Sequence, residues 1–131
     1  MASVDVACGI VCEAEKVFVC RRKASKSLGG FWEFPGGKLE TGETAEACLK
    51  RELLEELQMD VEIVRHHMTV EHEYEHSKIK LISYICKLVR FEGHLSDHDR
   101  FAWLKVSDLA SIELAPADVP IARDLLKAPI T

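Results

Sequence analysis

Glutamate side chains recur at short intervals between residues 43 and 56. Glu52, Glu55 and Glu56 stand at positions i, i+3 and i+4, so on an α-helix they project from one face. A solvated helix commonly places Lys or Arg four residues after a glutamate, but here Glu56 follows Glu52 at that distance, and the two repel. We expect no local compensation for this charge. The acids are therefore either an ordinary solvated face or the ligands of a positive ion.

Two glycines upstream of these acids favour the ion. Pro35, Gly36 and Gly37 predict a turn, and without a side chain a glycine carbonyl can approach an ion closely. Hard divalent cations prefer oxygen ligands, and Mg²⁺ is usually bound by a few carboxylates together with substrate phosphates. The pattern therefore indicates a Mg²⁺ cofactor, with Mn²⁺ as a substitute.

The complete spacing, G-x5-E-x7-R-E-L-x-E-E, resembles the Nudix hydrolase box G-x5-E-x7-R-E-U-x-E-E-x-G-U, in which U is aliphatic. It is formed by Gly37, Glu43, Arg51, Glu52, Leu53, Glu55 and Glu56. Residues 34–40 lead into it as in the MutT-like branch. Gln58 departs from the pattern, because the family has a left-handed glycine there and another residue costs about 1 kcal/mol. The resemblance implies an α+β fold with a mixed β-sheet sandwiched between α-helices, and a single domain over residues 1–131.

The resemblance also assigns roles to the box residues. Glu52, Glu55 and Glu56 would ligate the metal together with a backbone carbonyl of Gly36 or Gly37. Glu43 and Arg51 would brace the loop against the helix, whereas without the resemblance Arg51 reads as a surface cation.

A further acid is expected from a loop outside the box, six residues before a tryptophan. Counting back from Trp103 gives Asp97, which would hold a metal or orient water as general base, a task also suggested for Glu52. Asp is one methylene shorter than the glutamate usual in this branch. The alternative is that Asp97 is an ordinary turn residue.

The base-reading residues are expected near the C-terminus. Residues 114–120 resemble the segment that reads the nucleobase in MutT-like enzymes, with Asp118 where the hydrolases of 8-oxo-dGTP have Asn. Members that hydrolyse CTP share the L-A-P-A-D-x-P form. Because an ionised carboxylate only accepts hydrogen bonds, Asp118 suits an exocyclic amine such as cytosine N4 or guanine N2. A helix N-cap is the competing role for Asp118.

The other substrate contacts are weaker assignments. Arg22 matches a nucleotide-contacting position, and Phe34 would present its ring to the base unless it only fills the core. Lys38 belongs to a group of cations near the box that would attract phosphates. Lys78 is a weaker candidate for a second substrate contact, because its alignment with the family's arginine is off by one position.

The implied activity is Mg-dependent hydrolysis of a nucleoside triphosphate to the monophosphate and diphosphate, with CTP, dCTP or 8-oxo-dGTP as substrate. One alternative is hydrolysis of ADP-ribose or another nucleoside diphosphate derivative. Another is a nucleotide-binding regulatory module without turnover, against which the complete set of box acids argues.

Composition is consistent with one small enzyme. The 131 residues are 47% hydrophobic, enough for a single core, and their formal net charge of −5 argues against a nucleic-acid polymer as partner. No apolar run is long enough to cross a membrane, so we expect a cytoplasmic protein, either monomer or homodimer. The five scattered cysteines predict buried thiols rather than disulfides.

Periodicity and turn residues predict the remaining elements. The expected strands cover residues 4–12, 16–21, 61–70, 79–89 and 101–104. The box helix starts after its cap Thr44 and runs to Leu57, and a closing helix covers residues 118–127. Residues 25–30 and the charged residues 71–78 are expected connections. His98 and the other five histidines are expected at the surface, because Mg²⁺ favours oxygen.

Overall fold

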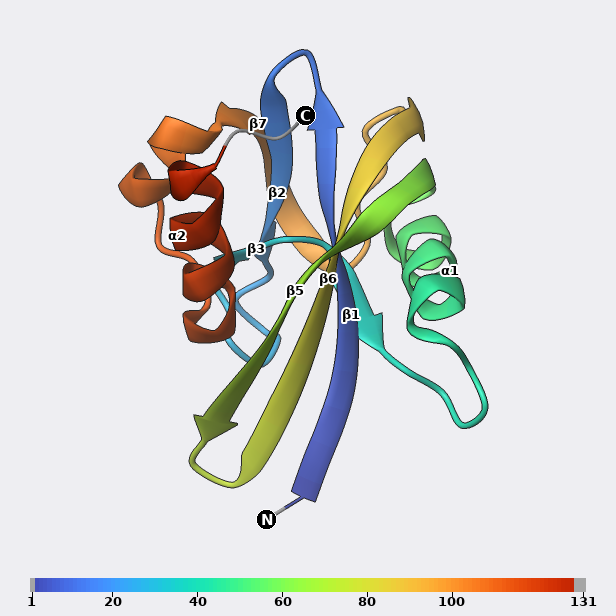
Figure 1. The fold of residues 1–131 in the computed structure, drawn as a ribbon, viewed down its shortest axis with the longest axis vertical. Helices are drawn as coiled ribbons and strands as arrows, with labels where there is room; N and C mark the ends of the chain where they lie inside the picture. The colour runs from blue at the N-terminus through green and yellow to red at the C-terminus, as the bar shows by residue number, and fades with distance from the viewer. Residues whose placement is uncertain (1, 129–131) are drawn as a thin grey trace.

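A computed structural model describes residues 2–128. Within this range one mixed sheet of seven strands lies between helices α1 and α2, which cover its opposite faces (Figure 1). The elements are β1 (Ala2–Glu13), β2 (Lys16–Arg22), β3 (Trp32–Glu33), β4 (Gly36–Lys38), α1 (Ala45–Leu57), β5 (Asp60–Tyr74), β6 (Ser77–Arg90), β7 (His98–Lys105), the 3-10 helices η1 (Val106–Ser111) and η2 (Pro116–Asp118), and α2 (Val119–Lys127).

Strand β1 is central, and its alternating side chains build both halves of the core. Ala7 and Val11 pack toward α1, whereas Cys8 and Ile10 pack toward α2, and all of them are buried. The strand pairs in parallel with β6 and antiparallel with β2 and β4, so the expected mixed sheet is confirmed. Because both faces are covered, β1 has a nearly continuous apolar sequence.

Helix α1 begins and ends as expected. The Thr44 hydroxyl accepts a hydrogen bond from the Ala47 N–H at 3.1 Å, and Leu49, Leu53 and Leu57 are buried against the sheet. At the end of the helix Gln58 has φ of 49°, the left-handed conformation that the family's glycine adopts at no steric cost. None of the helices within residues 2–128 is long and apolar enough to cross a lipid bilayer.

The expected connection over residues 71–78 is wrong. Strand β5 continues to Tyr74 and β6 begins at Ser77, so the hairpin turn is short. Glu71 lies opposite Lys80 and Glu73 opposite Lys78. Pairs of opposite charge stabilise adjacent strands, which is why this charged stretch is extended rather than a loop.

Two short strands, β3 and β4, were not predicted from the sequence. They position the segment that leads into α1 (residues 34–44), which we call the box loop. Strand β4 pairs with β1, and Gly36 lies opposite Cys8. A Cβ at Gly36 would overlap the backbone carbonyl of Ala7, so this pairing requires glycine. Strand β3 pairs with β2 and brings residues 32–33 beside the loop.

Candidate active site

Acids from α1 and from the loop before β7 form one cluster. The Glu56 side chain is half-buried and hydrogen-bonds the side chain of Asp97. The hydroxyl of Ser96 donates to the backbone carbonyl of Glu56 at 3.0 Å, which holds the loop against the helix. Glu52 belongs to the same face of α1, with 15% of its side chain exposed. The tertiary structure therefore brings Asp97 to the box acids.

The carboxyls of this cluster differ in their proton affinity. Burial is the largest cause that raises the pKa of Glu56, and together with the hydrogen bond to Asp97 and the charge of Glu52 it brings this pKa to about 9. The same hydrogen bond lowers the pKa of Asp97, so Glu56 is the donor and Asp97 the ionised acceptor. Burial also raises the pKa of Glu52, although Arg51 opposes this effect.

Arg51 is the organising cation of the box. Its guanidinium donates to both carboxylate oxygens of Glu43, at 2.7 and 2.9 Å, and to the backbone carbonyl of Lys38 at 3.3 Å. It also contacts Glu52 at 2.9 Å and Glu55 at 3.1 Å. The expectation that nothing local compensates the acids is wrong, because helix periodicity does not show a neighbouring side chain folding back over them.

Glu43 and Glu55 differ in how firmly Arg51 holds them. The hydrogen bond from Arg51 is the main reason why the pKa of Glu43 falls to about 2. Its carboxylate also accepts from the Glu40 N–H at 3.0 Å, so it ties the loop to α1. Glu55 is 60% exposed and lies at the edge of the cluster.

Gly37 is the contact between the box loop and α1. A Cβ at this position would overlap the carboxylate of Glu52, so only glycine lets the two approach this closely. The Gly37 carbonyl accepts a weak hydrogen bond from the buried Cys48 thiol at 3.4 Å. The backbone at Gly36 and Gly37 thus lies beside the acids that the sequence analysis assigned to the metal.

A cavity of about 180 Å³ opens on the other side of this loop. Among the residues lining it are Arg22, Glu33, Phe34, Gly37, Tyr74 and Asp118. Gly37 therefore belongs both to the cavity wall and to the contact with Glu52, and the cavity adjoins the acidic cluster.

Asp118 lies at the inner end of the cavity and is only 6% exposed. Its carboxyl accepts a hydrogen bond from the Phe34 N–H at 2.9 Å and makes no capping bond to α2. Burial, reinforced by the charge of Glu33, raises the pKa of Asp118 well above its ordinary value. This direction favours a protonated Asp118 over the ionised carboxylate that the sequence suggested, and a protonated carboxyl both donates and accepts. The N-cap alternative is wrong for the side chain.

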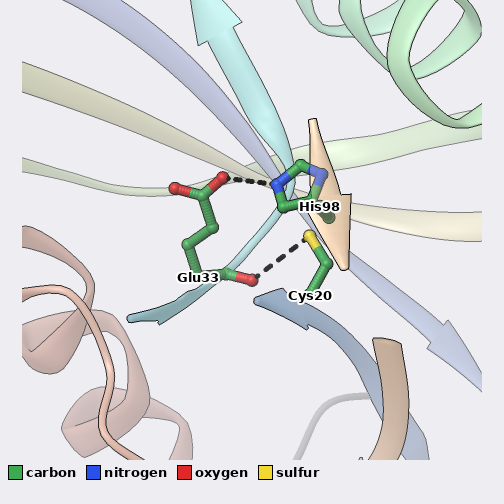
Figure 2. A group of neighbouring side chains, drawn as sticks. All are labelled: Cys20, Glu33 and His98. Carbon is green, nitrogen blue, oxygen red and sulfur yellow. Dashed lines mark hydrogen bonds and ion pairs between the residues drawn. The ribbon is translucent and has the colours of Figure 1, made fainter. Parts of the chain in front are cut away.

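Arg22 and Glu33 line the cavity, and the His98 imidazole points toward the Glu33 carboxylate (Figure 2). His98 Nε2 lies 2.8 Å from Glu33 Oε2, and Arg22 Nη1 lies 3.4 Å from the same oxygen. The expectation that His98 is a surface residue is wrong, because it is 2% exposed. His98 is the first residue of β7, and its imidazole points inward. The strand expected over residues 101–104 did not reach His98, so the alternation of buried and exposed side chains in that strand could not predict this orientation.

The two candidate lysines have different surroundings. The exposed Lys38 lines the rim of the cavity next to Gly37. Lys78 is not among the cavity-lining residues of the described chain, and its ammonium instead pairs with Glu71 at 3.3 Å. The structure therefore brings Lys38 to the candidate site and leaves Lys78 in the β5–β6 hairpin.

Sequence reasoning missed Glu33 and Tyr74. The Tyr74 hydroxyl accepts from the Ala117 N–H at 3.4 Å at the cavity, whereas Tyr74 was assigned to a loop. A single acid between Trp32 and Phe34 was the available signal for Glu33, because charged residues are rarely placed between aromatic ones without a partner.

The donor set beside Gly37 suits a divalent cation. The side chains of Glu52, Glu56 and Asp97 offer only oxygen atoms as ligands. The raised pKa of Glu56 means that its ionised form is unfavourable here, and a nearby cation would stabilise that form. Within residues 2–128 the ligand atoms that lie within 4.8 Å of one another are those of Cys20, Glu33 and His98, so a metal bound by Glu52, Glu56 and Asp97 would have to draw their oxygen atoms closer together. Glu55 and a carbonyl of Gly36 or Gly37 would add further oxygen ligands.

Comparison with known proteins agrees with this arrangement. The NUDIX domain family matches residues 6–124. An 8-oxo-dGTP diphosphatase from Proteus vulgaris is 43% identical over 79 residues, which are 60% of this chain and 70% of that protein. The CTP pyrophosphohydrolase of Escherichia coli (strain K12) is 30% identical over 123 residues, 92% of this chain and 90% of that one. The solution structure of the MutT protein from methicillin-resistant Staphylococcus aureus 252 is 33% identical, with a TM-score of 0.78 over 97% of this chain and 98% of that chain.

Proposed function

Because this chain belongs to the NUDIX domain family, we propose that it hydrolyses a nucleoside triphosphate to the monophosphate and diphosphate, with Mg²⁺ or Mn²⁺ as cofactor. The observation that supports this most strongly is the double position of Gly37. It lines a cavity of about 180 Å³ and also contacts Glu52 in the acidic cluster. A nucleoside in the cavity would thus direct its phosphates along the Gly36–Gly37 backbone toward the acids.

Cytosine and oxidised purines fit the polar groups of the cavity. A protonated Asp118 carboxyl, which its raised pKa favours, would offer a donor, and Glu33 would offer an acceptor in the same cavity. Cytosine presents the complementary pair at N3 and the N4 amine, and 8-oxoguanine presents one at O6 and N7–H. We therefore propose CTP, dCTP or 8-oxo-dGTP as substrate, in line with the names of the relatives.

The chain's own residues have separable tasks in this reaction. Glu52, Glu55, Glu56 and Asp97 would hold the metal, which supplies Lewis-acid stabilisation of phosphate charge and acidifies bound water. Lys38 and Arg22 would contact the phosphates and the nucleotide. Arg51 and Glu43 keep the loop in place.

The proton of the attacking water needs a carboxylate acceptor. Asp97 is the ionised member of the Glu56–Asp97 pair, and Glu52 is the second candidate for this base. The proton acceptor must lie within hydrogen-bond reach of the water that attacks phosphorus. The contact of Glu52 with Gly37 and the contact of Asp97 with Glu56 support these two candidates.

A coupled phosphate assay with CTP, dCTP, 8-oxo-dGTP and ADP-ribose, run with Mg²⁺, tests the proposal. We expect phosphate from at least one triphosphate only when inorganic pyrophosphatase is added, because the product is diphosphate. Phosphate without pyrophosphatase would contradict the bond assignment. Hydrolysis of ADP-ribose gives AMP and ribose 5-phosphate, so this arm contains alkaline phosphatase in place of pyrophosphatase. Turnover of ADP-ribose alone would favour a nucleoside diphosphate derivative, and turnover of none would favour a regulatory binding module.

A further inference from the structure

Glu33 is held in the cavity wall by contacts that converge on one of its oxygens. Oε2 lies 2.8 Å from His98 Nε2 (Figure 2). The same oxygen lies 3.4 Å from Arg22 Nη1, and the Glu33 side chain is 16% exposed. The three residues come from β3, β7 and β2, so the sheet fixes their relative positions. Within residues 2–128 these contacts engage Oε2, which leaves Oε1 as the acceptor for a ligand.

The His98 imidazole makes this hydrogen bond from a fully buried position. Its side chain has 0% exposure, and among the described residues Nδ1 has no hydrogen-bond partner. Because a carboxylate only accepts, Nε2 carries the proton and donates to Glu33. A buried ring with one unsatisfied nitrogen is a poor choice for packing alone, since an apolar residue of similar volume would avoid that cost.

Glu33 needs an anchor because a second acid lies close by. The charge of Glu33 acts on the buried Asp118, whose carboxyl is held by the Phe34 N–H at 2.9 Å. A glutamate side chain has three rotatable bonds, so without these contacts its carboxylate would populate several rotamers beside Asp118. Contacts at Oε2 restrict the rotamers of Glu33. A carboxylate that is already fixed then loses less conformational entropy when a ligand binds.

We propose that His98 is a positioning residue that fixes the Glu33 carboxylate as the hydrogen-bond acceptor for the nucleobase. This inference rests on the proposed function, because it assigns the cavity to the nucleoside. In this role His98 acts through its hydrogen bond to Glu33. It follows Asp97 directly in sequence, so its effect has to be separated from an effect on the acidic cluster.

The same residues also have the donor types of a zinc site, since atoms of Cys20, Glu33 and His98 lie within 4.8 Å of one another. The hydrogen bonds favour the positioning role. The Cys20 thiol donates to the backbone carbonyl of Glu33 at 3.7 Å, and burial raises its pKa well above the ordinary value. The thiol is thus a protonated donor that holds the β3 backbone, while His98 holds the β3 side chain.

Two substitutions at His98 test the hydrogen bond. In His98→Gln the amide nitrogen can replace Nε2 as the donor, whereas His98→Leu removes the donor at similar volume. For His98→Leu we expect the KM of the best triphosphate substrate to rise about tenfold, the usual effect of losing a hydrogen bond to a charged group. We expect kcat to change by less than about threefold and His98→Gln to restore most of the loss. The matched control is His67→Gln, at a histidine that pairs with Asp124 on α2, and its KM should equal that of the wild type.

A double-mutant cycle shows whether His98 acts through Glu33. In a Glu33→Gln background, His98→Leu should add less than about a twofold change in KM, because the charged acceptor is already gone. Full additivity would overturn the proposal. So would a change in the Mg²⁺ concentration for half-maximal activity without a change in KM, since that result would assign His98 to the Asp97 loop.

Binding measurements keep this test independent of turnover. Titration of CMP without added metal, followed by the fluorescence of Trp32, should show a weaker Kd for His98→Leu than for the wild type. A wild type that binds CMP but hydrolyses nothing would refute the proposed function and leave the inference standing. Equal Kd values for His98→Leu and the wild type would overturn the inference.

Titration with Co²⁺ as a zinc analogue distinguishes the competing role. The wild type should show no thiolate-to-cobalt absorption, and Cys20→Ser should have the same spectrum. A thiolate band that disappears in Cys20→Ser and is weakened or shifted in His98→Leu would show that Cys20 and His98 bind metal, and the positioning role would then be wrong.

Discussion

The carboxylate of Glu52 lies so close to Gly37 that a Cβ on residue 37 would overlap it. This contact joins the helix that carries the box acids to the loop that lines the cavity. Both sides of the candidate site therefore depend on the absence of a side chain at one position.

Gly37→Ala should displace Glu52 or the β4 backbone. Because a shift of about 1 Å at a catalytic group can lower the rate about a hundredfold, we expect a loss of at least that size in kcat/KM. Steady-state kinetics with the best triphosphate would measure it. Gly9→Ala is the control, since its Cβ would meet its nearest neighbour, Cys86 Sγ, at 3.4 Å. Equal activity of the two variants would contradict the role of the Gly37 contact.

Glu56→Gln should separate activity from stability. The pKa of about 9 means that Glu56 is protonated at neutral pH without metal, so a neutral amide of the same shape should leave the metal-free Tm nearly unchanged. We expect kcat to fall by orders of magnitude and the rise in Tm on adding Mg²⁺ to disappear, because a ligand charge is lost. Glu62→Gln, at an exposed position of β5, removes the same charge elsewhere and should behave as the wild type.

The metal-free protein should lose stability as the pH rises. The folded pKa of Glu56, about 9, lies above its ordinary value of 4.5, so its contribution is complete below pH 4.5 and is lost as the pH rises through 9. Asp118 adds a slope of the same sign because its pKa is also raised. Denaturant unfolding from pH 5 to 9 should show a shallower slope for Glu56→Gln than for the wild type.

Magnesium should reverse this trend. The ionised carboxylate is the ligand, so Mg²⁺ binding releases a proton and becomes tighter as the pH rises. The Mg²⁺-induced increase in Tm should therefore grow between pH 6 and pH 9 in the wild type. An increase that does not depend on pH would show that Glu56 is not among the ligands.

Substitutions at Asp118 test its neutral form. Asp118→Asn keeps an acceptor for the Phe34 N–H and a donor toward the cavity, so KM should change by less than about fivefold. Asp118→Leu removes both, and KM should rise at least about tenfold. A larger loss for Asp118→Asn than for Asp118→Leu would indicate that an ionised carboxylate is needed.

Gln58→Gly should stabilise the protein. Gln58 has φ of 49° at the end of α1, and relief of this left-handed conformation is worth about 1 kcal/mol. The Tm should rise by about 4 °C in calorimetry. Gln58→Ala keeps the positive φ without the relief and should not raise Tm. Activity should be unchanged in both variants, because the exposed Gln58 side chain points away from the core.

Local features were predictable because their causes lie within a few residues. The cap at Thr44, the acids on one face of α1 and the left-handed Gln58 each follow from backbone geometry over one or two turns. The extent of β5 was not predictable, because its charged end is extended only by pairing with Lys78 and Lys80 on β6.

By itself the sequence determined which acids share a helix face, and their spacing identified the family. Only the tertiary structure decided that Asp97 meets Glu56 and that His98 meets Glu33, because these pairs join elements that are distant in the chain. It also decided which carboxyls have a raised pKa. The pKa of Glu56 and of Asp118 depends on how much water the surrounding residues remove, and burial is a property of the packed chain rather than of any local segment.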